Sequence, residues 1–169
     1  HRRYACDALG KIGDPAALPA IQRALGSENA MLRAYAVSSI RHFEDESVVP
    51  ALTQGLRDSF WRVRVSAAEA LGEMAAEEAL PILDFKARLD PEDNVQDAAI
   101  RAIAAIGTTE AFDMIRTFFE DETFALPLRV TCAELLAEHR PAESLESFKH
   151  VVATEMERRE SKLLERLGY

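Results

Sequence analysis

Residues 63–83 read VRVSAAEALGEMAAEEALPIL, and this stretch recurs along the chain. Aligned on its central leucine, the copies follow one another at spacings of 31, 31, 32 and 33 residues, with the anchors Leu9, Ile40, Leu71, Ile103 and Leu136. Seven positions before each anchor stands a second column, Arg2, Arg33, Arg64, Gln96 and Arg129. Ten positions after the first three anchors stands a third, Pro19, Pro50 and Pro81. Self-similarity at a period of about 20–50 residues is typical of stacked repeat architectures.

Each copy contains two runs of apolar residues at helical spacing, separated by turn residues. In the first copy, Gly13 ends one helix, Asp14 caps the next and Pro15 opens it. Pro19 would then lie about one turn inside the second helix and should kink it. The predicted copies cover residues 1–28, 29–59, 60–91, 92–124 and 125–169. The last copy ends in a longer, more polar segment, which we expect to be a capping helix.

The run Val-Arg-x-x-Ala-x-x-Ala-Leu-Gly over residues 63–72 resembles the HEAT repeat, as do Gly13-Asp14-Pro15 and Pro19 in the first copy. The short spacing is similar to that of the HEAT-like repeats of phycobilisome lyases. This resemblance implies an all-α fold, a right-handed α-solenoid of about five stacked helical hairpins. It covers nearly the whole chain, so we expect residues 1–169 to form a single repeat domain.

Composition excludes several classes of protein. The net charge is −9, and residues 76–125 alone hold 4 basic and 12 acidic side chains. Nucleic-acid binding requires a basic surface, so no nucleic-acid partner is expected. No run of 18 apolar residues occurs, which predicts no membrane insertion. Cys6 and Cys132 stand four repeats apart, too far for a disulfide, which favours reduced thiols and a cytoplasmic location. Since His1 is not an initiator methionine, we expect the chain to be part of a longer protein.

No constellation for catalysis or metal binding is visible, so we expect no enzyme activity, no catalytic residues, no metal and no cofactor. The histidines are scattered and none forms a metal-ligand spacing: His1, His42, His139 and His150. The acids of residues 90–93 and 120–122 are expected to be solvated loop charges, with a docking edge for a basic partner as the alternative. The arginine column is expected to be structural, pairing with acids of the preceding loop, as Arg64 would with Asp58.

In HEAT proteins the helix carrying the anchor column lines the concave face, so its positions outside the core are candidates for binding a partner. Trp61 has two interpretations, an interface anchor or a residue packed between repeats. The leading hypothesis is a non-catalytic protein–protein interaction scaffold or adaptor that binds another protein there. The alternative is a bilin lyase-like subunit acting on a chromophore-carrying protein. The candidate partner-binding residues are Tyr4, Asp7, Tyr35, Ser38, Trp61, Ser66, Glu69, Glu73, Arg101 and Glu134.

Overall fold

The computed structural model describes residues 2–43 and 46–167, and every regular element within them is helical. The all-α repeat fold is therefore confirmed. The chain divides into two compact units, His1–Ala111 and Phe112–Tyr169. The single domain expected over residues 1–169 stays a prediction. Unit 1 contains α1 (Arg2–Ile12), α2 (Leu18–Leu25), α3 (Ala30–Ile40), α4 (Val49–Gly55), α5 (Trp61–Glu73), α6 (Leu80–Leu89) and α7 (Asp93–Ile106). The boundary falls within α8 (Thr109–Glu120), and α9 (Leu126–His139) and α10 (Pro141–Leu167) belong to unit 2.

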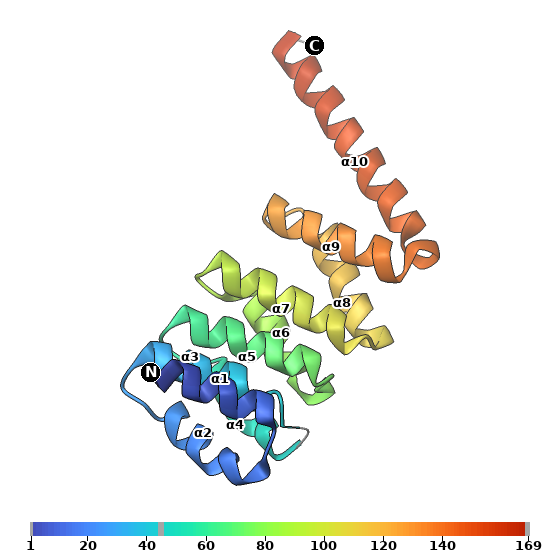
Figure 1. Ribbon diagram of the computed structural model, residues 1–169. Helices are drawn as coiled ribbons and strands as arrows, with labels where there is room; N and C mark the ends of the chain where they lie inside the picture. The colour runs from blue at the N-terminus through green and yellow to red at the C-terminus, as the bar shows by residue number, and fades with distance from the viewer. Residues whose placement is uncertain (1, 44–45, 168–169) are drawn as a thin grey trace. The chain divides into compact units, whose positions relative to one another are not determined.

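The helices of unit 1 form two layers (Figure 1). In the first, which we call the odd layer, α1 packs against α3, α3 against α5 and α5 against α7. In the second, α2, α4 and α6 each pack against the odd-layer helix that follows them in the chain. The anchor residues Ile40, Leu71 and Ile103 are fully buried between these layers. Stacking thus buries an apolar stripe that a single helical pair could not cover.

Small residues set the distance between neighbouring odd-layer helices. A Cβ atom added to Gly72 on α5 would lie 2.7 Å from the Cα atom of Ala102 on α7. A Cβ atom on Gly10 of α1 would lie 2.8 Å from the carbonyl oxygen of Ser39 on α3. The second copy has Arg41 at this position, and there α3 ends at its anchor, Ile40. The close contacts of α1 with α3 and of α5 with α7 therefore require glycine at this position.

The proline column does not kink a helix, so that prediction was wrong. Residues Pro15–Ala17 form a short 3₁₀ helix, and α2 begins only at Leu18. Pro19 thus stands in the first turn of α2, as Pro50 and Pro81 do in α4 and α6. The backbone N–H groups of a first turn have no partner within the helix, so proline removes no hydrogen bond there. The column marks the start of each second-layer α-helix.

The arginine column is structural, but its acidic partners come from the following loop rather than the preceding one. Arg33 donates two hydrogen bonds to Asp58, Nε to Oδ2 at 2.7 Å and Nη2 to Oδ1 at 2.8 Å. Arg64 donates to Asp90 in the same way, Nε to Oδ2 at 2.9 Å and Nη2 to Oδ1 at 2.7 Å. The third guanidinium nitrogen of Arg64 donates to the backbone carbonyl of Asp58 at 2.9 Å. Each arginine thus ties its own helix to the loops on both sides.

The partner aspartates also shape the turn before each odd-layer helix. In each case the side-chain oxygen accepts the backbone N–H two residues on, as Asp90 does from Glu92 at 3.2 Å. Asp90 is buried and accepts from Lys86 Nζ at 2.9 Å as well, so it is not the solvated loop charge that we expected. In the fourth copy Gln96 replaces the arginine, and its amide donates to the Asp90 carbonyl at 2.8 Å. The turn column comprises Ser27, Asp58, Asp90 and Asp121.

The pairs Arg33–Asp58 and Arg64–Asp90 form a ladder along the repeats, and we expect this ladder to make the protein less stable in acid. The hydrogen bond from Arg33 lowers the pKa of Asp58 below the ordinary value of 3.8. Burial raises the pKa of Asp90, but the hydrogen bonds from Arg64 and Lys86 outweigh it, and the net pKa is lowered. The unfolded chain therefore binds more protons below pH 3.8, and the stabilisation is lost as the pH falls through the lower folded-state values.

Urea unfolding measured from about pH 6 down to about pH 3 tests this expectation, because the slope of stability against pH reports the difference in bound protons. Asp58→Asn should flatten the slope below pH 4. The matched variant Glu78→Gln, which removes an exposed carboxylate from the short 3₁₀ helix that precedes α6, should leave the slope nearly unchanged. An unaltered slope in Asp58→Asn would contradict the role of this pair.

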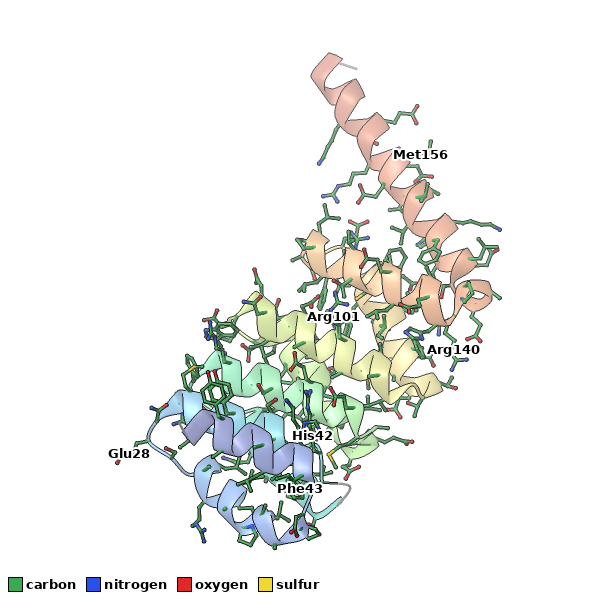
Figure 2. All side chains as sticks on the ribbon, viewed as in Figure 1. Glu28, His42, Phe43, Arg101, Arg140 and Met156 are labelled. Atoms are coloured by element: carbon green, nitrogen blue, oxygen red, sulfur yellow. The ribbon has the colours of Figure 1, made fainter. Side chains whose placement is uncertain are left out.

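Unit 2 is held together by aromatic and polar contacts. Phe119 and Phe148 meet edge to face with ring centroids 5.2 Å apart. Arg129, the last member of the arginine column, is buried and donates from Nε to the Phe119 carbonyl at 2.9 Å. The side chain of Cys132 is buried, whereas that of Cys6 lies outside the described residues. The predicted polar C-terminal segment is one helix of 27 residues, α10, which extends past α9 with Met156 exposed on it (Figures 1 and 2).

Candidate functional site

The clearest candidate site in unit 1 is a groove between α5 and α7. Its volume is about 510 Å³, and residues of these two helices alone line it. It therefore opens on the face of the odd layer that points away from the second layer. Four of the ten candidate residues lie along it, namely Trp61, Glu69, Glu73 and Arg101. The other lining residues are Val65, Asn94, Asp97, Ala98, Ala102 and Ala105.

The α5 wall is a stripe with one residue at every fourth position, from Trp61 through Val65 and Glu69 to Glu73. Successive members are about 6 Å apart along the helix axis, because the rise is about 1.5 Å per residue. Trp61 is half-buried, and the guanidinium of Arg62 lies 5.1 Å from the centre of its ring. The wall is thus apolar over its first half and acidic over its second.

The α7 wall is lined mainly by small side chains. Ala98 and Ala102 are buried and Ala105 is exposed, and the three follow one another at helical spacing. Beside them, Arg101 Nε donates to Asp97 Oδ2 at 2.8 Å, an ion pair one turn apart on the same helix. Figure 2 labels Arg101, which projects from α7. The alanines leave the volume of the groove open, and the ion pair leaves this wall without net charge.

The two glutamates of the α5 stripe differ in their partners. Glu73 accepts a hydrogen bond from Arg41 Nη1 at 2.6 Å, so a residue of α3's C-terminal cap neutralises it. Glu69 is exposed and makes no ion pair within the part of the chain that the structure describes. The net charge of the groove therefore rests on Glu69.

The structure does not bring the other candidate residues into this groove. Tyr4 is 67% exposed on α1. Tyr35, Ser38 and Ser66 are half-buried on α3 and α5 and line no part of it, and the side chain of Asp7 lies outside the described residues. Glu134 is exposed on α9 in unit 2. There it follows Leu126 and Val130 at the same register positions that Trp61, Val65 and Glu69 occupy on α5.

Sequence reasoning missed Val65, Asn94 and Asp97 as groove residues, and it missed Arg41 as the partner of Glu73. A signal for Val65 was present, because it stands one turn from both Trp61 and Glu69 on the same helix face. No comparable signal marks Arg41, since it lies 32 residues before Glu73 in the chain. Its position follows only from the packing of α3 against α5.

The described residues contain no group of three or more histidine, cysteine, aspartate or glutamate side chains that could hold a metal ion. None of the described helices combines the length and apolar character that crossing a bilayer requires. The groove offers aromatic, aliphatic and carboxylate surface, together with one intrahelical ion pair. Such a lining fits contact with a side-chain surface of mixed apolar and charged character.

Comparison with protein families finds two matching models. The model described as HEAT repeats matches residues 21–84. The model described as PBS lyase HEAT-like repeat matches residues 2–27 and 95–121. A search of curated proteins found no match to this sequence. The matched segments span α1 to the first half of α6, nearly all of α7 and all of α8, and so include every lining residue of the groove except Asn94.

Proposed function

The chain belongs to the HEAT-repeat family, and from this premise we propose that it is a non-catalytic scaffold that binds another protein on the exposed face of its odd layer. The α5–α7 groove is the observation that carries the proposal. Trp61, the alanines of the α7 wall and the unpaired carboxylate of Glu69 lie along one continuous surface. Interface hot spots are enriched in tryptophan and are surrounded by polar groups.

The lining of the groove also supports a role in binding rather than catalysis. It presents no serine, threonine, cysteine, lysine or histidine among the described residues. Nucleophilic catalysis needs such a group together with a base that activates it. Asp97, the acid on the α7 wall, is paired with Arg101. A surface of this composition is suited to recognition.

Site-specific crosslinking tests the proposal. A photoreactive amino acid at Val65, inside the groove, should crosslink one defined protein in an extract of the source cells. The same group at Glu78, exposed in the short 3₁₀ helix that precedes α6, should not capture that protein. Trp61→Ala should abolish the crosslink from Val65 while leaving helix content and thermal unfolding nearly unchanged. Equal capture from both positions, or no capture from Val65, would overturn the proposal.

A second candidate is a bilin lyase-like subunit that acts on a chromophore-carrying protein. The match of residues 2–27 and 95–121 to the PBS lyase HEAT-like repeat favours it. The two candidates differ in a simple measurement with biliverdin as the probe. A scaffold should leave the visible absorbance of biliverdin unchanged and the fluorescence of Trp61, the one tryptophan of the chain, unquenched. A saturable change in both signals would favour the second candidate.

A further inference from the structure

The charges of the α5–α7 groove identify the kind of side chain that a partner must bring. Asp97 is neutralised by Arg101 at 2.8 Å, and Glu73 by Arg41 at 2.6 Å. Glu69 has no such partner within the described residues. An additional acidic side chain in the groove would meet an unopposed negative charge, whereas a basic one would pair with it. The chain as a whole is acidic, with a net charge of −9, which adds long-range attraction for a basic segment.

The apolar half of the groove lies at a defined distance from that charge. Trp61 and Val65 stand two turns and one turn before Glu69 on α5, so they lie about 12 and 6 Å from it along the axis. The facing alanines of α7 leave room beside them for aliphatic side chains. A partner that fills the groove therefore presents two apolar groups and one basic group at steps of about 6 Å.

The period of these positions favours a helical partner. Residues four apart on an α-helix are separated by about 6 Å, the same step as in the α5 stripe. Residues on one face of an extended strand are separated by about 6.7 Å, which accumulates an offset of about 2 Å over the length of the stripe. The step of a helix along its axis therefore matches the step of the α5 stripe, and that of a strand does not.

We propose that the α5–α7 groove recognises an amphipathic helix of another protein, with apolar side chains one turn apart against Trp61 and Val65 and a lysine or arginine one turn further on against Glu69. This inference rests on the proposed function and specifies the chemistry of the partner. The aliphatic side chains of the partner are buried between Trp61 and the alanines of the α7 wall. The ion pair with Glu69 fixes the direction and register of the partner helix. Neutral and acidic helices of the same shape are discriminated against at Glu69.

Fluorescence of Trp61 provides a direct readout, because no other tryptophan contributes. The probe is a synthetic alanine- and glutamine-based helix of about 18 residues, with leucines one turn apart and a lysine one turn further on. We expect saturable binding with a blue shift of the Trp61 emission, since the ring leaves water. The same peptide with glutamate in place of lysine should bind about 10-fold more weakly, because it loses the ion pair with Glu69 and is repelled by that carboxylate.

Variants of the protein test whether Glu69 causes the preference for the lysine peptide over the glutamate peptide. Glu69→Gln should weaken binding of the lysine peptide about fivefold, and Glu69→Lys should reverse the preference in favour of the glutamate peptide. Glu78→Gln is the matched control and should leave both affinities unchanged. Higher salt should reduce the difference between the peptides. Replacing the leucines with glutamine should abolish the shift of Trp61 emission.

The outcomes separate this inference from the proposed function. Equal affinity for the lysine and glutamate peptides, or an unchanged preference in Glu69→Lys, would overturn the assignment of a basic helix. Absence of any Trp61 response to the lysine peptide would overturn it as well. In either case a partner crosslinked specifically from Val65 would still support the scaffold. Loss of that crosslink would reject the scaffold itself.

Discussion

Replacing Asp90 with alanine is expected to lower the free energy of unfolding by about 3–5 kcal/mol, the usual cost of leaving a buried charge without its partner. The Asp90 side chain is fully buried and that of Arg64 is 8% exposed, so water cannot replace the lost carboxylate. The same substitution removes an acceptor for Lys86 and the turn hydrogen bond from Glu92 that precedes α7. Urea unfolding followed by circular dichroism measures the loss.

Asp84→Ala is the matched control for this prediction. Asp84 lies on α6, the helix that ends one residue before Asp90, and pairs with Arg88 at 3.0 Å. Both side chains of that pair are about one-third exposed, at 29% and 34%. Exposed ion pairs one turn apart contribute about 0.3–0.5 kcal/mol. An Asp90→Ala variant no less stable than Asp84→Ala would show that the ladder has no structural role.

A double substitution separates the two contributions to the loss. Arg64→Met with Asp90→Leu removes both charges and leaves apolar side chains of similar volume. Buried pairs replaced in this way often lose little stability, because the desolvation cost of both ions disappears. We therefore expect the double variant to recover much of the stability lost in Asp90→Ala. Recovery would assign the loss mainly to the unpaired guanidinium of Arg64.

The helical-repeat fold could be predicted because its signal is local. The anchor residues recur at helical spacing, and glycine and proline mark the ends of helices, so the copies can be aligned by inspection. The structural role of the arginine column followed from its repetition. Its partner did not, because Asp58, the nearest acid before Arg64 in the chain, pairs with Arg33, whereas Arg64 pairs with Asp90, 26 residues further on. The repeated aspartate column at these loops was the signal that would have corrected the assignment.

The groove could be predicted only in outline, for the same reason. Periodicity places Trp61, Glu69 and Glu73 on one face of a helix, and the sequence supports this without a structure. Whether a carboxylate on that face carries free charge depends on contacts between copies. Glu73 is neutralised by Arg41 of the preceding copy and Glu69 is not, although both are glutamates on the same stripe of α5. The difference that determines the proposed specificity therefore arises from packing.

Gly72→Ala is expected to destabilise the chain by about 2 kcal/mol, because overpacking outweighs the gain of about 1 kcal/mol in helix propensity. The added Cβ atom would lie 2.7 Å from Ala102 Cα and 3.1 Å from its carbonyl oxygen. These are backbone atoms, so the contact cannot be relieved by rotating a side chain. The helices α5 and α7 must move apart, which also widens the groove between them.

Gly26→Ala serves as the control, since both variants add one methyl group to a glycine. Gly26 has a φ of −86°, and a Cβ atom there would meet nothing closer than 3.6 Å. Its expected effect is neutral or slightly stabilising, up to about 1 kcal/mol, because alanine restricts the unfolded chain. Thermal unfolding of the two variants measures the difference. Equal stability would mean that α5 and α7 tolerate separation, and the distance between the walls of the groove would then not be set by Gly72. A loss confined to Gly72→Ala, together with weaker binding of the lysine peptide, would link the packing of this glycine to recognition at Glu69.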